Sequence, residues 1–212
     1  VKNGIVSIRT TLCNTDKIKA NSILDNIEEE ICRELGVYVY SKRDETLEST
    51  ISEIFSEKAI TLAVAESCTG GLVSNLLTNV QGSSAFFLGG IVSYSNKVKE
   101  NLLNVPEKLI NEFGVISAEV AKAMASGARE RIQADIGLAI TGIAGPTGVD
   151  VNVDRERPVG LVYVATAIND ELECKEYSFF GSRIDIKRRA ANAALNTLRL
   201  ALAGKVTKQR KH

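Results

Sequence analysis

The first residue that could do chemistry is the serine of AESCTGG (residues 65–71), which directly follows the apolar run ITLAV (residues 60–64). A nearly continuous apolar run is typical of a central strand buried on both faces, and the small residues after it suit an abrupt turn into a helix. Open α/β sheets bind ligands at this carboxyl edge, where backbone N–H groups can stabilise an oxyanion. Ser67 is therefore a candidate nucleophile, with oxyanion donors expected from Cys68 to Gly70.

Two other interpretations of this turn remain open. Ser67 or Thr69 could serve only as the N-cap of the next helix, while Gly70 and Gly71 permit the tight approach. The N–H groups at the start of that helix could instead cradle a phosphate group. The motif alone does not choose among a nucleophile, a helix cap and a phosphate loop.

The second candidate is Lys99, in the segment VSYSNKVK (residues 92–99). The strand-like residues 91–94 run into Ser95, a good N-cap, which places Lys99 near the first turn of a helix. If the two strands are parallel, Lys99 lies at the same sheet edge as Ser67. Desolvation and the positive helix end would lower the pKa of its ammonium group, and a neutral lysine can act as general base to a serine hydroxyl. The alternative is a solvated surface lysine.

Two further segments could bind an anion at this edge. TGIAGPTG (residues 141–148) follows the strand-like IGLAI, and its backbone N–H groups could cradle a phosphate or a sugar, with Thr141 offering a hydroxyl. Arg183 follows Gly181 and Ser182 at the junction between a strand and the last helix, and its planar guanidinium suits bidentate recognition of phosphate or carboxylate. Gly-Pro turns are also common in ordinary loops.

The chain has a single histidine, His212, in the basic tail KVTKQRKH. This disfavours a Ser-His-Asp triad, a Cys-His pair and histidine-ligated metals, so acid–base chemistry must come from Lys, Tyr, Asp or Glu. The four cysteines form no CxxC pair, which indicates reduced thiols rather than a zinc site or a disulfide framework. We expect no metal and no cofactor.

The order of predicted elements indicates a layered α/β/α domain with a central mixed, largely parallel sheet, preceded by a small β-α-β segment. We place the boundary near Ser41, so that residues 1–41 form the small segment and residues 42–212 the main domain. Strands are expected at residues 4–12 and 37–40 around a helix at 16–35. A hairpin is expected around Asn169 and Asp170, and a last helix at 184–202 that Gly204 ends.

The composition of the chain limits the class of protein and the partners that it could have. With 212 residues, 44% hydrophobic residues and a formal net charge of +0, the chain is expected to be a soluble protein with one main core. It has no apolar run near the ~20 residues of a membrane span and no signal peptide, so we expect a cytoplasmic protein without a membrane partner. Neutral charge gives no support to nucleic-acid binding. The initial Val1, in place of Met, suggests a fragment of a longer chain.

Taken together, five segments closely resemble the C-terminal domain of the CinA family: residues 65–105, GVISAEVAKAMASGARE, LAITGIAGPTG, RPVGLVYVA and FFGSR. The family includes nicotinamide-nucleotide amidases, also called NMN deamidases. The resemblance spans residues 47–203 with the motifs in the same order. VSIRTTL and ICRELGVYVYSKRDETLE look like the end of the KH-like linker that precedes this domain in long family members. The chain departs from the family pattern at residues 149–154, where relatives usually have a shorter link.

The resemblance implies that Ser67 is the nucleophile and that Lys99 completes a Ser-Lys dyad, with Tyr94 assisting. It also implies that Thr141 and Gly142 belong to the substrate pocket, that Arg183 meets the substrate phosphate and that Cys68, Thr69 and Gly70 contact substrate.

The implied reaction converts nicotinamide mononucleotide to nicotinate mononucleotide and ammonia, in pyridine nucleotide salvage, and the implied assembly is a homodimer. The alternative is a catalytically silent nucleotide-binding or protein-interaction module linked to competence or DNA-damage responses. Nucleic-acid binding by the KH-like remnant is not expected, because the module is incomplete.

Overall fold

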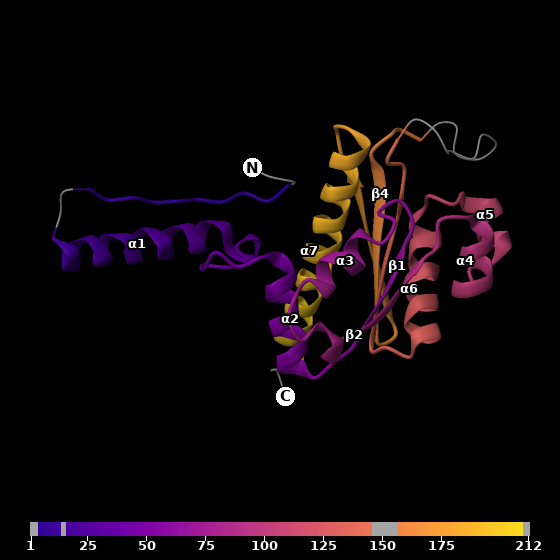
Figure 1. The fold of residues 1–212 in the computed structure, drawn as a ribbon, viewed down its shortest axis with the longest axis horizontal. Helices are drawn as coiled ribbons and strands as arrows, with labels where there is room; N and C mark the ends of the chain where they lie inside the picture. The colour runs from indigo at the N-terminus through magenta and orange to yellow at the C-terminus, as the bar shows by residue number, and fades with distance from the viewer. Residues whose placement is uncertain (1–3, 14–15, 146–156, 210–212) are drawn as a thin grey trace.

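The computed structural model describes residues 4–13, 16–145 and 157–209 (Figure 1). Its centre is a five-stranded sheet in the order β2-β1-β3-β4-β5. The strands are β1 (Leu62–Glu66), β2 (Phe87–Val92), β3 (Ile136–Gly142), β4 (Leu161–Ile168) and β5 (Glu171–Ser178). Strand β1 pairs in parallel with β2 and β3, while β3–β4 and β4–β5 are antiparallel. The predicted mixed sheet is confirmed.

Burial follows the sequence pattern of the strands. Every residue of β1 is buried, and β3 is buried from Ile136 to Thr141, as expected for near-continuous apolar strands covered on both faces. The expected hairpin joins β4 to β5, and Asn169 adopts the left-handed conformation in its turn. The domain core therefore lies on both sides of β1 and β3.

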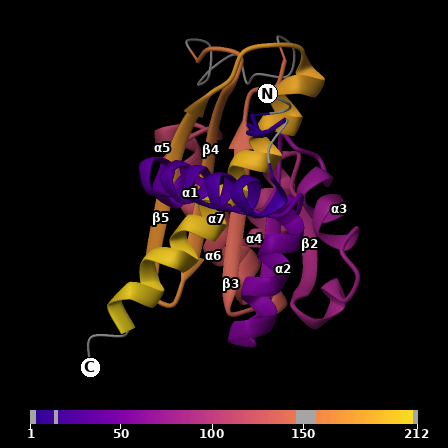
Figure 2. The ribbon, with the colours of Figure 1, turned by 90° about the vertical axis from the view of Figure 1, so that its left-hand side faces the viewer.

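Helices cover both faces of the sheet (Figures 1 and 2). One layer contains α2 (Leu47–Lys58), α3 (Leu72–Thr78) and α7 (Arg183–Gln209), and the other contains α4 (Asn96–Leu103), α5 (Glu107–Phe113) and α6 (Ala118–Ile132). Alternate residues of β1 face opposite layers: Leu62 and Val64 pack with α2, α3 and α7, while Ala63 and Ala65 pack with α6. This confirms the predicted α/β/α layers.

The N-terminal segment differs from its prediction. Helix α1 (Lys17–Leu35) forms as expected, with Asp16 as its N-cap and Gly36 at its end, but none of its residues is buried and it projects away from the sheet (Figure 1). The strands expected around it are wrong: residues 6–13 form no strand, and Gly36–Tyr38 form a short 3-10 helix, η1. A strand needs a hydrogen-bonded neighbour, and neither segment joins the sheet.

Two helices also differ from expectation. Helix α7 continues past Gly204 to Gln209, because a glycine inside a helix costs only about 1 kcal/mol relative to alanine and does not by itself end it. Helix α5 was not predicted. Of the helices in the described residues, none is both long and apolar enough to cross a membrane.

Candidate active site

The carboxyl ends of three strands meet at one edge of the sheet, as the sequence predicts. Glu66, the last residue of β1, lies beside Val92 of β2 and Ile140 of β3. The backbone stays paired one residue further: the N–H of Ser67 donates to the carbonyl of Ile140 at 2.9 Å, and the N–H of Ser93 donates to the carbonyl of Glu66 at 2.7 Å. Ser67 is therefore held at the end of the central strand.

Lys99 reaches Ser67 from helix α4. Its Nζ lies 3.2 Å from Ser67 Oγ and 2.7 Å from the carbonyl oxygen of Ser93. Ser95 caps the helix by accepting from the N–H of Val98, as predicted. Lys99 is only 1% exposed, so the interpretation as a solvated surface lysine is wrong.

Burial sets the acid–base properties of this lysine. Desolvation disfavours the ammonium form and lowers the pKa of Lys99 from 10.5 to about 8. No carboxylate forms a salt bridge with Lys99 in the described part of the chain. About a tenth of Lys99 is thus neutral at pH 7, and about half at pH 8, with a lone pair that can take the proton of Ser67.

The pKa of Lys99 predicts how stability depends on pH. The folded value of about 8 lies below the ordinary 10.5, so the unfolded chain binds more protons between these two pH values. The free energy of unfolding should rise from pH 8 to pH 10.5 by up to about 1.4 kcal/mol per pH unit from this group. Urea unfolding of wild type and Lys99→Met at several pH values measures the difference. Parallel pH curves for the two proteins would contradict the assignment.

The hydrogen bonds of the turn after Ser67 decide between the nucleophile, helix-cap and phosphate-loop interpretations of this motif. Neither Ser67 nor Thr69 caps α3; instead, the side chain of Glu66 accepts from the N–H groups of Gly71, Val73 and Ser74 at 2.8–3.0 Å. The helix-cap interpretation of Ser67 and Thr69 is therefore wrong. Because an acidic side chain already occupies the first donors of α3, the phosphate-loop interpretation loses its donors as well.

Fewer backbone N–H groups are available as oxyanion donors than the sequence predicts. The N–H of Gly70 donates to the carbonyl of Ser67 at 3.1 Å and is already used. The N–H groups of Cys68 and Thr69 donate to no acceptor among the described residues and remain available beside Ser67. The thiol of Cys68 is no rival nucleophile, because burial raises its pKa to about 12.

A pocket of about 340 Å³ opens in front of Ser67. It gathers most of the predicted site residues: Ser67, Cys68, Tyr94, Lys99, Thr141, Gly142 and Arg183. Ile143, Ala144 and Gly145 also line it and belong to the glycine-rich segment that was predicted to cradle a ligand, whereas its lining residues Asn96, Val115 and Ile116 were not predicted. Asn96 stands in the same YSN segment and could have been found, whereas Val115 and Ile116 precede α6 and are brought in only by the packing of helices.

The polar groups of the pocket are linked to one another. Arg183 Nη2 donates to Tyr94 Oη at 2.7 Å, and a Cβ placed on Gly145 would lie only 2.9 Å from Arg183 Nη1. Tyr94 is 61% exposed, so the structure places it with Arg183 and not in a buried position beside the dyad. The Thr141 hydroxyl is buried and donates to the carbonyl of Val115 at 3.1 Å, which fixes the pocket wall.

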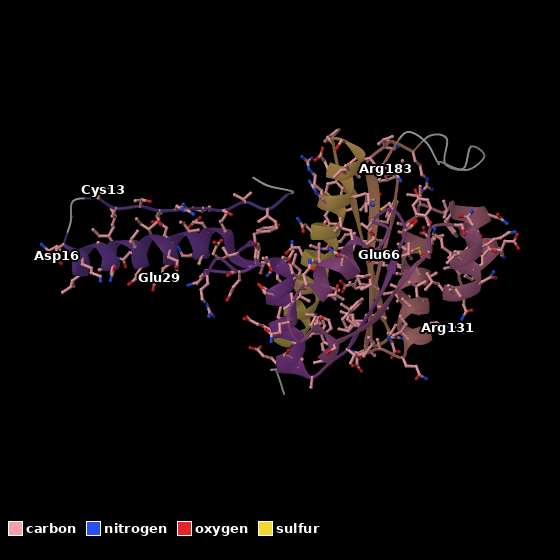
Figure 3. All side chains as sticks on the ribbon, viewed as in Figure 1. Cys13, Asp16, Glu29, Glu66, Arg131 and Arg183 are labelled. Carbon is pink, nitrogen blue, oxygen red and sulfur yellow. The ribbon has the colours of Figure 1, made fainter. Side chains whose placement is uncertain are left out.

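Thr69 and Gly70 line a different pocket, of about 310 Å³, between the start of α3 and the start of α7. The structure therefore does not place Thr69 and Gly70 in the lining of the Ser67 pocket, which Cys68 lines. Figure 3 shows Glu66 between the helical layers and Arg183 toward the end of the sheet. The altered segment at residues 149–154 lies outside the described residues.

The chain is similar in sequence to known proteins. The model of the CinA C-terminal domain matches residues 44–202. A protein of Caldicellulosiruptor saccharolyticus, named as competence-damage inducible, is 43% identical over 194 residues, which are 92% of this chain and 46% of that protein. A CinA-like protein of Dictyoglomus thermophilum is 40% identical over 201 residues, or 95% of this chain and 48% of that protein. The chain spans about half the length of these relatives.

Solved structures show the same relationship. The competence/damage-inducible protein of Agrobacterium tumefaciens is 36% identical, with a TM-score of 0.68 over 74% of this chain and 93% of that one. A competence damage-inducible protein of Klebsiella pneumoniae is 29% identical, with a TM-score of 0.69 over 74% of this chain and 95% of that one. The residues matched by the family model, 44–202, contain all five strands of the sheet, and each of these structures covers 74% of the chain. The chain therefore belongs to the CinA family and contains its C-terminal domain.

Proposed function

We propose that this chain is an amidohydrolase that converts nicotinamide mononucleotide to nicotinate mononucleotide and ammonia. The observation that carries the proposal is the pair of buried side chains Ser67 and Lys99, with Nζ 3.2 Å from Oγ, at the floor of a pocket that also contains an arginine. A lysine whose pKa is lowered by burial is suited to activate a serine. This reaction belongs to pyridine nucleotide salvage.

The proposed reaction begins when neutral Lys99 takes the proton of Ser67 and Oγ attacks the carboxamide carbon. The N–H groups of Cys68 and Thr69 stabilise the oxyanion of the tetrahedral intermediate. The Lys99 ammonium then gives its proton to the leaving nitrogen, so that ammonia departs and an ester remains on Ser67. Water, deprotonated by neutral Lys99, cleaves that ester; nicotinate mononucleotide leaves and Ser67 regains its proton.

The pocket walls fit a pyridine mononucleotide. Its volume of about 340 Å³ is within the range for small-molecule sites, and Val115, Ile116 and Ile143 give it an apolar wall for a flat ring. Arg183 supplies a permanent positive charge for a phosphate group. The hydrogen bond from Arg183 to Tyr94 holds the guanidinium at the pocket.

Substitution of Arg183 tests recognition of the phosphate. In Arg183→Gln we expect the KM for nicotinamide mononucleotide to rise about 10- to 100-fold, since a charge-assisted hydrogen bond is lost. The KM for nicotinamide riboside, which lacks the phosphate, should change little. Steady-state kinetics on both compounds measure the ratio. An equal rise in KM for the two compounds would remove Arg183 from phosphate recognition.

Product analysis tests the proposed reaction itself. After incubation of the purified chain with nicotinamide mononucleotide, we expect equal amounts of ammonia and nicotinate mononucleotide. Release of free nicotinamide would instead show cleavage of the glycosidic bond, and a folded protein that forms no product would favour the silent-module alternative. Such a module would still be stabilised thermally by the nucleotide without consuming it.

A further inference from the structure

The side chain of Glu66 is buried beside Ser67 and has no role in the proposed reaction steps. It is 0% exposed and accepts four hydrogen bonds. Oε2 accepts from the N–H groups of Gly71 and Val73, each at 3.0 Å. Oε1 accepts from the N–H of Ser74 at 2.8 Å and from its hydroxyl at 2.7 Å. A buried carboxyl group is costly unless it is fully hydrogen-bonded, so this arrangement constrains the local structure strongly.

The turn that carries Ser67 has little rigidity of its own. Gly70 and Gly71 both have positive φ angles, at +61° and +92°, in the region that only glycine adopts easily. Helix α3 has seven residues, which is too short to be stable without tertiary contacts. Within residues 67–70 the backbone has one hydrogen bond, from the N–H of Gly70 to the carbonyl of Ser67, so the further constraint on their conformation comes from groups outside these residues.

Glu66 supplies that constraint because it joins the two ends of the turn. Its backbone is held in the sheet by β2 and β3, while its side chain holds the start of α3. Residues 67–70 form the loop closed between these two anchors. The directions of Ser67 Oγ and of the N–H groups of Cys68 and Thr69 follow from this closure.

Strand β2 leaves room for the same network. A Cβ placed on Gly90 would lie 2.3 Å from Ser74 Oγ, well inside contact distance. Glycine is unfavourable inside a strand unless another group approaches closely. Gly90 therefore permits Ser74 to place its hydroxyl against Glu66.

We infer that Glu66 is a positioning residue for catalysis: its side chain, with Ser74 held beside Gly90, sets the direction of the Ser67 nucleophile and of the two oxyanion N–H groups. The inference rests on the proposed role of Ser67. Glu66 touches neither substrate nor reacting atoms. It acts through the turn, so its loss should reduce the rate of bond making and leave ground-state binding at Arg183 intact.

The test compares Glu66→Gln and Ser74→Ala with wild type, with Thr78→Ala as the matched control. Thr78 is on the same helix, but its hydroxyl bonds only the carbonyls of Ser74 and Asn75. In Glu66→Gln the new amide N–H₂ faces backbone N–H donors, and we expect kcat to fall at least about tenfold with KM unchanged within about threefold. In Ser74→Ala we expect a smaller fall in kcat, again with KM nearly unchanged. Thr78→Ala should have the kcat and KM of wild type.

A second readout separates this inference from the proposed substrate. The rate at which a fluorophosphonate labels Ser67 is measured without any nucleotide, and it should fall in step with kcat, while its pH profile keeps the midpoint near 8 set by Lys99. If wild type is labelled but does not hydrolyse the nucleotide, the proposed function fails and the labelling rates still test Glu66.

Labelling within twofold of wild type in both Glu66→Gln and Ser74→Ala would overturn the inference, as would a wild type that is not labelled at all. If Glu66→Gln does not fold, Gly90→Ala takes its place, because its methyl group displaces the Ser74 hydroxyl from Glu66.

Discussion

Replacing Ser67 with alanine is expected to reduce ammonia release from nicotinamide mononucleotide by about 10⁴-fold or more, because removal of a nucleophile leaves only the contribution of binding and oxyanion stabilisation. The affinity for the nucleotide should change little, because the Ser67 hydroxyl is uncharged and contributes no ionic contact in the pocket. Initial rates at saturating substrate, with a binding measurement on the same protein, check both expectations.

The control for Ser67→Ala is Ser126→Ala, in helix α6. The Ser126 hydroxyl bonds the Glu130 side chain on the same helix and does not line the pocket. We expect this variant to keep the wild-type rate. A Ser67→Ala protein that releases ammonia as fast as wild type would rule out the covalent mechanism.

Replacing Lys99 with methionine is expected to lower kcat by about 10²- to 10⁴-fold, the usual contribution of a general base. The folded state should lose little stability, because methionine fills similar space and removes a buried group that is poorly solvated when charged, which offsets the lost hydrogen bond to the Ser93 carbonyl. Rates and thermal unfolding on the same preparation measure the two effects. A large loss of activity with little loss of stability distinguishes a functional buried lysine from a structural one.

The companion variant is Lys99→Arg. A guanidinium keeps the positive charge but does not lose its proton in proteins, so it cannot accept the proton of Ser67. We expect Lys99→Arg to be as inactive as Lys99→Met. Substantial activity in Lys99→Arg would show that the charge of Lys99 matters and its basicity does not.

Much of the fold could be predicted because local patterns and tertiary contacts agree. The apolar runs before Ser67 and before Thr141 form β1 and β3, and Ser95 begins α4, so Lys99 reaches the edge where Ser67 lies. The strands predicted at residues 4–12 and 37–40 do not form, because here the local pattern and the tertiary contacts disagree. Their patterns fit a strand, but no neighbouring strand pairs with them in the structure.

The missed parts of the site depend on contacts that spacing does not encode. Val115 and Ile116 enter the pocket from the connection between α5 and α6, and α5 itself was not predicted. Glu66 is the last residue of β1 but was predicted to lie in the turn after the strand, and its sequence position gave no sign that its side chain caps α3. One signal was present: the residue just before α3 is Gly71, which has no side chain to cap the helix.

Labelling of Ser67 by a fluorophosphonate, with and without nicotinamide mononucleotide, tests most directly the claim that Ser67 is the Lys99-activated nucleophile of the substrate pocket. We predict a single adduct on the peptide that contains Ser67, formed faster as the pH rises through about 8 and suppressed by the nucleotide. An adduct on another residue would contradict the account. So would a Ser67 adduct that forms at the same rate with and without the nucleotide.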